Sequence, residues 1–335
     1  MPTAAVIGCG DVSVVHFDAL ESLLGVLLVG VCDTDPKRLA TAMTTHDVPG
    51  YGDHLTLLEV VRPDVVHICT PHNQHAAVAM DCLERGVHVI LEKPLAHTLD
   101  EGRRLVEVAE RGSAKIAVCL QNRYNPPVQA MHRMLSSGEL GRVLGGAATV
   151  LWYRDADYYQ SRPWRGTWQG SGGGLLMNQA IHTVDLLQWL LGDVTGVSGH
   201  VSTRVLGDAI EVEDTAEFVL EHQGGARSVF YATLANVVNA PVTLDIVTEM
   251  ATLSLRGDLA VNYSDGRVLS VPERKAPTGG RAYWGVSHEL LIRDFYDRLE
   301  EDTPFWISTR EAEKSLRIVK RIYQQTFPDA TTAVS

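Results

Sequence analysis

The chain has 335 residues, of which 45% are hydrophobic and 21% are charged, and this length favours two domains in an ordinary globular protein. Its formal net charge of −12 comes with no run of lysine or arginine, which argues against a nucleic-acid partner. No apolar segment approaches the roughly 20 residues that span a bilayer, and Met1 leads directly into a predicted strand without a basic leader. We therefore expect a cytoplasmic protein with no membrane partner.

A strand, a glycine turn and a helix open the chain. Residues 4–7 form a short apolar run, Gly8 and Gly10 follow it, and a helical pattern continues to Leu24. In a dinucleotide-binding turn the first glycine permits the tight turn and the second lets the backbone approach a pyrophosphate, which the helix N-terminus attracts. Ser13, a small residue, replaces the third glycine. The predicted cofactor contacts in this turn are Gly8, Cys9, Gly10, Asp11 and Val12.

The next predicted strand, residues 26–32, ends at Asp33. A carboxylate at this place suits the ribose 2′-hydroxyl of NAD and would repel the additional phosphate of NADP. Lys37 and Arg38 lie close enough in the sequence to offset that repulsion, but NAD is the predicted cofactor. An alternative or additional role for Asp33 is to cap the helix that begins near Asp35 and Pro36.

Strands and helices alternate over the first third of the chain. Predicted strands at residues 65–69, 87–91 and 116–120 alternate with predicted helices at residues 55–61, 75–85 and 99–111. Such alternation predicts a parallel, doubly wound sheet, so we expect residues 1–122 to form a Rossmann domain. The loops after the first two of these strands should lie side by side over the cofactor. They and the end of the last strand add Thr70, Pro71, His75, Glu92, Lys93 and Gln121 to the predicted cofactor contacts.

An apolar run at residues 89–91 ends abruptly in Glu92, Lys93 and Pro94. A buried strand of a parallel sheet has a continuous apolar run, and ligands of such sheets bind beyond the carboxyl ends of the strands. Lys93 is therefore placed where chemistry is expected. The alternative for an arbitrary Glu-Lys pair is a solvated turn.

Neither the cysteines nor the histidines of this half predict a metal site. The five cysteines have no C-x-x-C spacing and lie mostly in apolar runs, which predicts reduced core thiols rather than disulfides or metal ligands. His67, His72 and His75 share their spacing with no carboxylate or cysteine. His75 is also well placed simply to begin a helix, so no metal is expected.

A polar junction with two prolines, at residues 121–127, marks a change of pattern. Strand-like runs follow at residues 143–153, 197–205, 213–221, 227–234, 242–248 and 251–255, and few helices separate them. We expect residues 123–335 to form a second domain with a mainly antiparallel sheet. One face of that sheet would carry helices and the other a partner subunit. Amphipathic helices are predicted at residues 287–301 and 309–324.

One helix stands out within this second domain. A Gly-Gly-Gly run at residues 172–174 precedes it, and Asn178, His182 and Asp185 follow at positions i, i+4 and i+7, which places them on one face of an otherwise apolar helix. Two interpretations remain open: a His-Asp hydrogen bond satisfied inside the protein, or side chains that meet a ligand. The glycines favour the second, because a helix start without side chains permits close approach of a ligand.

Tryptophan, tyrosine, arginine and aspartate are concentrated at residues 152–168. Such residues suit a ligand with apolar ring faces and many hydroxyls, such as a sugar. They suit a subunit interface equally well. The predicted substrate contacts are Arg123, Tyr124, Tyr153, Arg165 and Trp168, together with Lys93, Asn178 and His182.

In their order and spacing these motifs resemble those of the Gfo/Idh/MocA oxidoreductases over nearly the whole chain. The resemblance rests on Gly8-Cys9-Gly10, on Glu92-Lys93-Pro94, and on the glycine run followed by His182 and Asp185. It implies an N-terminal Rossmann domain, a C-terminal α/β domain with a large open antiparallel sheet, and tightly bound NAD(P). It also implies oxidation or reduction of a secondary hydroxyl of a sugar, cyclitol or related compound, and a homodimer or homotetramer joined through the open sheet.

By position, Lys93 corresponds to the catalytic lysine of that family and His182 to its catalytic histidine. Many members have an aspartate four residues before the histidine, and Asn178 stands there in this chain. An amide can orient a hydroxyl but cannot carry a proton, so the Lys-Asp-His relay is interrupted. The predicted catalytic residues are Lys93, His182 and Asn178. We expect His182 to be the acid/base, Lys93 to stabilise the substrate oxygen and Asn178 to orient a hydroxyl. Asp185 would either orient the imidazole or be a structural partner.

The predicted function is therefore NAD-dependent oxidoreduction at a secondary hydroxyl. One alternative is an NAD-dependent glycosidase that works by transient oxidation and elimination. The other is a regulator that binds NAD and a sugar without turnover, which the retention of Lys93 and His182 disfavours. Composition and spacing do not choose between a free sugar, a cyclitol, a glycoside and a nucleotide sugar.

Overall fold

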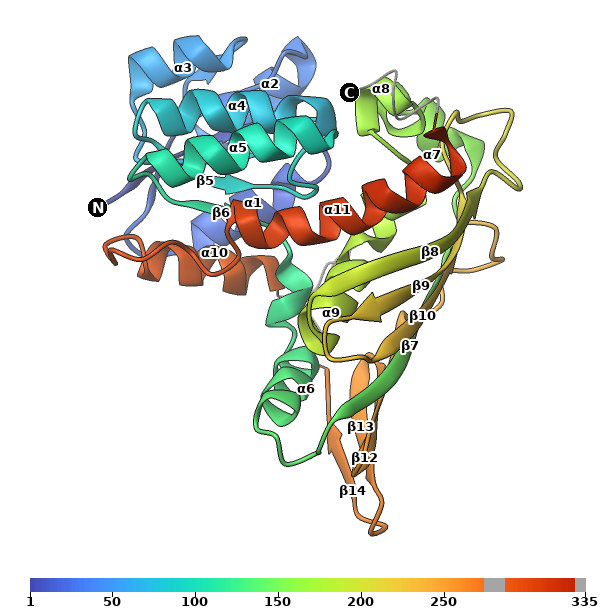
Figure 1. The fold of residues 1–335 in the computed structure, drawn as a ribbon. Coiled ribbons are helices and arrows are strands. Elements are labelled where there is room, and N and C mark those ends of the chain that lie inside the picture. The colour runs from blue at the N-terminus through green and yellow to red at the C-terminus, as the bar shows by residue number, and fades with distance from the viewer. Residues whose placement is uncertain (274–286, 329–335) are drawn as a thin grey trace. The chain divides into compact units, whose positions relative to one another are not determined.

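The computed structural model describes residues 1–273 and 287–328, and the chain divides into two compact units. The first unit comprises Met1–Cys119 and His288–Glu313. The second comprises the described residues of Leu120–Ser287 and Lys314–Ser335. Each unit is built around one sheet (Figure 1).

The first unit is a doubly wound parallel sheet, as predicted. Its six described strands run in the order β3-β2-β1-β4-β5-β6, and every neighbouring pair is parallel. The strands are β1 (Thr3–Ile7), β2 (Leu27–Cys32), β3 (Gly50–Tyr51), β4 (Val65–Ile68), β5 (His88–Leu91) and β6 (Ile116–Val118). The helices are α1 (Ser13–Ser22), α2 (Pro36–His46), α3 (His54–Val61), α4 (His72–Glu84), α5 (Leu99–Arg111) and α10 (Ser287–Asp297).

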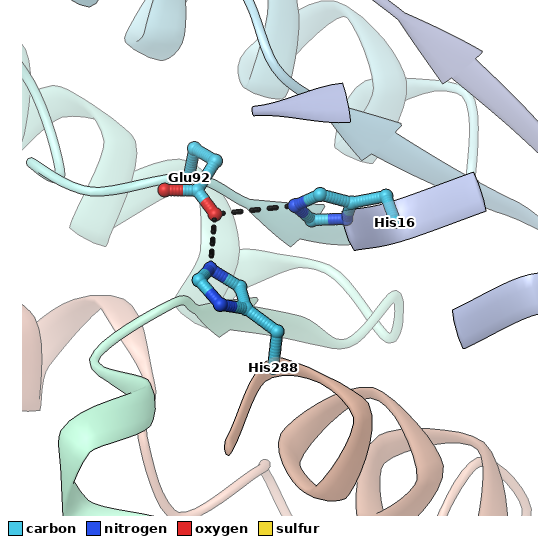
Figure 2. Close-up of side chains that lie close together, drawn as sticks. All are labelled: His16, Glu92 and His288. Atoms are coloured by element: carbon cyan, nitrogen blue, oxygen red, sulfur yellow. Dashed lines mark hydrogen bonds and ion pairs between the residues drawn. The ribbon is translucent and has the colours of Figure 1, made fainter. Parts of the chain in front are cut away.

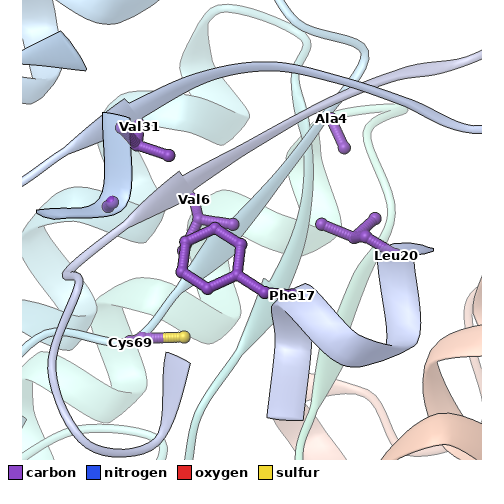
Figure 3. Packing of buried hydrophobic residues seen from close by; sticks show 7 residues of the cluster. Ala4, Val6, Phe17, Leu20, Val31 and Cys69 are labelled. Atoms are coloured by element: carbon purple, nitrogen blue, oxygen red, sulfur yellow. The ribbon is translucent and has the colours of Figure 1, made fainter. Parts of the chain in front are cut away.

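Burial of apolar side chains orders this sheet and its first helix. Every residue of β4 and β6 is buried, as a strand covered on both faces requires. Phe17 and Leu20 of α1 pack on β1 and β2 (Figure 3), which holds the start of α1 at the end of β1. The buried cluster consists of Ala4, Val6, Phe17, Leu20, Val31, Ala42 and Cys69. All five cysteines of the chain are free thiols.

The second unit contains a large, mostly antiparallel sheet. Its eight described strands run in the order β14-β13-β12-β11-β7-β10-β9-β8, and only the β7–β10 pair among them is parallel. The predicted α/β fold class is thus confirmed, and β13 and β14 extend the sheet beyond the predicted strands. The strands are β7 (Val143–Leu151), β8 (Val194–Ser202), β9 (Thr215–His222), β10 (Arg227–Thr233), β11 (Thr243–Thr248), β12 (Ala251–Arg256), β13 (Asp258–Tyr263) and β14 (Val268–Val271).

The faces of this sheet differ in exposure. Along β10, Ser228 and Phe230 are buried whereas Val229 and Tyr231 are exposed, which is the alternation of a sheet covered on one face. The helices and helical turns of the unit are η1 (Gln121–Tyr124), α6 (Pro126–Ser136), α7 (Ala156–Gln160), η2 (Pro163–Gly166), α8 (Trp168–Ser171), η3 (Leu176–Ala180), α9 (Ile181–Leu191) and α11 (Thr309–Thr326).

The division of the chain differs from the predicted one. The prediction assigned all of residues 123–335 to the second domain, whereas His288–Glu313 packs with the first unit. Leu291, Ile292 and Phe295 of α10 are fully buried, and the main-chain N–H of Val118 donates to the carbonyl of Ile307 at 3.0 Å. An amphipathic pattern predicts that a helix buries one face, but does not say against which sheet.

Among the described residues, no helix combines the length and the apolar character that a membrane span requires.

Candidate active site

The glycine turn after β1 has the geometry that a dinucleotide needs. Gly8 has φ +92°, and a Cβ there would lie 2.6 Å from the carbonyl carbon of Cys69, so only glycine fits. At Gly10, in contrast, a Cβ would meet nothing within 4 Å. The backbone therefore faces open space in front of the N-terminus of α1, where a pyrophosphate can approach.

Asp33, which directly follows β2, is a buried carboxylate held by main-chain and arginine donors. It accepts hydrogen bonds from the main-chain N–H of Cys9 at 2.8 Å and of Asp35 at 2.7 Å, and Arg38 donates to both of its oxygens at 3.1 and 3.0 Å. Asp35, rather than Asp33, caps α2 by accepting from Lys37 and Arg38 N–H groups. Asp33 thus holds the glycine turn to the end of β2.

His75 joins the loops that follow β4 and β5. Its side chain is buried, with Nδ1 2.7 Å from the carbonyl oxygen of Pro94 and Nε2 3.0 Å from that of Thr70. Burial lowers the pKa of His75, although both carbonyl contacts oppose that shift. The two loops therefore lie side by side, as predicted, and His75 bridges them from within the protein.

Glu92 directly follows β5, and its buried carboxylate accepts hydrogen bonds from two imidazoles. His16 Nε2 of α1 and His288 Nε2 of α10 lie 3.1 and 2.9 Å from its Oε1 atom (Figure 2), and the Lys93 main-chain N–H donates to Oε2 at 3.3 Å. Burial opposes ionisation of Glu92, but the hydrogen bonds from both imidazoles outweigh it and hold the pKa well below its ordinary value. The Lys93–Pro94 peptide bond that follows is cis.

His67 extends this arrangement further into the unit. Its Nδ1 lies 2.9 Å from Nδ1 of His16, and its Nε2 lies 3.0 Å from the hydroxyl of Tyr296. Burial lowers the pKa of His16 and lowers that of His67 well below the ordinary value. The structure thus joins Glu92 to histidines 76 and 196 residues away in the sequence, which the sequence analysis did not identify.

In the second unit, Gly173 and Gly174 accommodate the protein's own chain. A Cβ at Gly174 would collide with the carbonyl oxygen of Glu213, and one at Gly173 with the hydroxyl of Tyr323. At these two glycines the protein's own chain therefore accounts for the absence of a side chain. Glu213, which the sequence analysis missed, is a buried carboxylate that accepts from Gly174 N–H and Leu176 N–H at 2.8 Å and from Tyr323 at 2.7 Å. Its position at the start of the predicted strand at residues 213–221, just before β9, was the available signal.

The helix that bears the predicted reactive side chains begins with a π-helical turn. Residues Leu176–Ala180 form this turn, η3, and α9 starts at Ile181, so the expected α-helical face is interrupted. Asn178 Nδ2 donates to the hydroxyl of Tyr158 at 3.1 Å, and the guanidinium of Arg165 lies 4.5 Å from the centre of the Tyr158 ring. Asn178 is thereby joined to the aromatic segment, and His182 is half-buried in α9.

Asp185 pairs with Arg123. Arg123 donates to both oxygens of Asp185, at 2.8 and 2.6 Å, and each side chain is only 1% exposed. This ion pair fits the structural role predicted for Asp185, and its orientation of the imidazole stays a prediction. The predicted substrate contact of Arg123 stays a prediction, although the side chain is buried.

The remaining predicted contacts are spread over both units. Trp168 Nε1 donates to the carbonyl of Glu211 at 3.0 Å, Tyr153 is exposed, and Gln121 is buried. Lys93 belongs to the first unit, whereas His182 and Asn178 belong to the second. The predicted roles of these residues stay predictions.

Fold and site together define a class: an NAD-binding Rossmann oxidoreductase with a second, sheet-based unit. Residues 3–119 match the family described as "Oxidoreductase family, NAD-binding Rossmann fold", and residues 128–254 match "GFO/IDH/MocA C-terminal domain". The chain belongs to the GFO/IDH/MocA oxidoreductase family.

Relatives of this chain are named dehydrogenases. D-apiose dehydrogenase of Rhizobium rhizogenes is 29% identical over 98% of this chain and 96% of its own length. Inositol 2-dehydrogenase of Burkholderia lata is 30% identical over 87% of this chain and 84% of its own length. The WlbA dehydrogenase of Bordetella pertussis, solved with NADH and UDP-GlcNAcA, matches with a TM-score of 0.82 and 28% identity over 96% of this chain and 95% of that one. These findings support an NAD-dependent dehydrogenase acting on CH–OH groups.

The buried histidines of the first unit predict a loss of stability in acid. The pKa values of His16 and His67 are lowered on folding. Below about pH 6.5 the unfolded chain therefore binds protons that the folded chain does not, and the free energy of unfolding decreases as the pH is lowered. Each such group contributes a slope of up to about 1.4 kcal/mol per pH unit. We expect Tm to fall between about pH 7 and pH 5, and to fall less steeply in His67→Asn. Calorimetry across this range measures it, with the exposed His200→Gln as control; equal slopes in wild type and His67→Asn would contradict the expectation.

The ion pair between Arg123 and Asp185 predicts that removing one charge lowers the free energy of unfolding more than removing both. Asp185→Ala leaves the Arg123 guanidinium buried without its carboxylate, which costs about 3–5 kcal/mol. The double variant Arg123→Met with Asp185→Leu removes both charges and should be less destabilised. Urea unfolding measures both free energies. A double variant less stable than Asp185→Ala would show that the pair is not the dominant contact of either residue.

Proposed function

We propose that the protein transfers hydride between NAD and a secondary hydroxyl of a sugar, cyclitol or sugar derivative. The observation that carries this proposal is the position of Lys93. It follows the carboxyl end of β5, just as Gly8 follows the carboxyl end of β1. Parallel sheets of this kind bind their ligands beyond the carboxyl ends of their strands. D-apiose, inositol and levoglucosan, named for the dehydrogenases among the relatives, are polyhydroxy compounds. The dehydrogenase names favour this function over the glycosidase and regulator alternatives.

The cofactor site would be formed by the strand ends of the first unit. The open space at Gly10 supports binding of the pyrophosphate, and Asp33 is a fixed carboxylate for the ribose. Arg38 is engaged with that carboxylate, which favours NAD over NADP. The proposed contacts are Gly8, Cys9, Gly10, Asp11, Val12, Asp33, Thr70, Pro71, His75, Glu92, Lys93 and Gln121.

Bound NAD supplies a hydride acceptor at its nicotinamide ring. In our proposal His182 takes the hydroxyl proton of the substrate, because a neutral imidazole has an ordinary pKa near 6.5, which suits a base at neutral pH. The ammonium group of Lys93 donates a hydrogen bond to the same oxygen and stabilises its developing negative charge. Asn178, whose amide donates to Tyr158, orients groups without relaying the proton.

The substrate contacts proposed beside these residues come from the aromatic segment and its surroundings. The guanidinium of Arg165 stacked on Tyr158 and the exposed ring of Tyr153 are features that suit hydroxyls and ring faces of a sugar. The full set is Lys93, Arg123, Tyr124, Tyr153, Arg165, Trp168, Asn178 and His182. We further propose a cytoplasmic homodimer or homotetramer joined through the second sheet, whose exposed face carries Val229, Tyr231 and Val247.

The first test replaces Lys93 with methionine. Removing the ammonium group should lower turnover by at least about a hundredfold, while NADH binding should change little because the glycine turn is intact. NADH absorbance with D-apiose, inositols and levoglucosan measures turnover, and NADH fluorescence measures binding. Lys314→Met on α11 is the matched control and should retain turnover. Wild-type turnover in Lys93→Met would refute the assignment.

The second test replaces His182 with alanine. Loss of the base should lower turnover by about 10²–10⁴-fold, and added imidazole should restore part of it because a free base can then occupy the vacated volume. Turnover as a function of imidazole concentration and pH measures the effect. A variant that retains full turnover, or whose lost turnover imidazole does not restore at any pH, would contradict a base role for His182.

A further inference from the structure

Five side chains of the first unit form one connected arrangement that the proposed function does not explain. We call it the histidine ladder, and it consists of Tyr296, His67, His16, Glu92 and His288 in that order of contact. His67, His16, Glu92 and His288 are each at most 4% exposed. Buried polar groups of this kind must satisfy one another, since water does not reach them.

The contacts of the ladder admit one arrangement of protons. Ionised Glu92 can only accept, so Nε2 of both His16 and His288 carries a proton. Burial keeps His16 neutral by lowering its pKa, which leaves a lone pair on its Nδ1. Nδ1 of His67, 2.9 Å away, must then be the donor. His67 is neutral for the same reason, so its Nε2 accepts from the hydroxyl of Tyr296.

The ladder ends on the main chain of Lys93. Both imidazoles point to Oε1 of Glu92 (Figure 2), whereas Oε2 accepts the N–H of Lys93 at 3.3 Å. Because His16 belongs to the helix after the glycine turn and His288 to α10, Glu92 ties both helices to the peptide that carries Lys93.

A bound cation does not explain this geometry as well. The ligand atoms of His16, Glu92 and His288 lie within 4.8 Å of one another, but a metal would need the lone pair of each Nε2 atom, which here bears the proton that Glu92 accepts. Structural zinc takes four ligands, and the second oxygen of Glu92 is engaged with the Lys93 main chain. Protons on both Nε2 atoms and a metal bound to them therefore exclude each other, and an experiment can tell which of the two is present.

We propose that Glu92 is a positioning residue: held by the imidazoles of the ladder, its carboxylate fixes the main chain of Lys93 at the end of β5. The proposal rests on the proposed function of Lys93. For Glu92 this role replaces the direct cofactor contact proposed above, because both of its oxygens already have protein partners. It also assigns His16 and His288 to the support of the site, although neither is expected to touch substrate.

Glu92→Gln should disturb this support without changing its volume. If the amide oxygen faces the imidazoles, the amide nitrogen faces the N–H of Lys93, and two donors meet. If the amide nitrogen faces the imidazoles, their N–H groups meet another donor, unless the protons of the histidines move to the opposite ring nitrogens. Displacement of a reactive group by about 1 Å costs about a hundredfold in rate, so kcat should fall by about 10–100-fold while the KM for NAD stays within about threefold.

Nitrogen-15 NMR of the full chain labelled at histidine tests the ladder without any substrate. We expect a proton on Nε2 of His16 and of His288, which face the carboxylate, and on Nδ1 of His67, each signal being assigned by its single variant. Opposite tautomers would overturn the proposal. So would one equivalent of tightly bound zinc in elemental analysis of the purified protein. These two measurements test the ladder even if no polyol is turned over or Glu92→Gln fails to fold.

Kinetics of matched variants test the positioning role. His288→Gln places an amide donor near the Nε2 position and should retain most of kcat, whereas His288→Leu, which has no donor, should lose about as much as Glu92→Gln. His222→Gln is the control, a buried histidine of the second unit bonded to Gly192 and Ser228, and should lower Tm with kcat unchanged. Wild-type kcat in folded Glu92→Gln would overturn the positioning role. Full turnover in Lys93→Met would instead refute the proposed function and leave the NMR result intact.

Discussion

The first unit depends on the satisfaction of one buried charge. Glu92 stands at the carboxyl end of β5, where water does not reach it, and an uncompensated carboxylate there would cost several kcal/mol. Its donors come from α1, from α10 and from the next peptide of the chain. One carboxylate therefore joins α1, α10 and the peptide of Lys93 at the end of β5.

The second unit uses a buried carboxylate in a related way. Glu213 accepts from the N–H groups of Gly174 and Leu176 and from Tyr323, and so fixes the start of the helical segment that leads to His182. Here burial raises the pKa of the carboxylate, and the hydrogen bonds from main-chain and phenol donors do not outweigh that effect. At Glu92 the two imidazoles do outweigh it. In each unit a buried acid thus positions the segment that carries a proposed reactive side chain.

Residues can be misassigned when a local pattern has two physical causes. The glycines at 172–174 suggested room for a ligand, yet Gly174 and Gly173 make room for Glu213 and Tyr323. Asp185 fell on a helical face with His182, yet its carboxylate is paired with Arg123, 62 residues earlier. In both cases the sequence correctly marked an unusual position, and a distant partner decided what the position does.

The sequence by itself determined the features that depend on neighbouring residues. Alternating patterns gave the parallel sheet and the antiparallel sheet, Gly8 marked a turn that admits no side chain, and the apolar run before Glu92 placed Lys93 at a strand end. Only the tertiary structure decided that His288–Glu313 packs with the first unit and that His16 and His288 meet Glu92. Periodicity reports which face of an element is buried, whereas a hydrogen bond across 196 residues depends on how the elements pack, which no local pattern encodes.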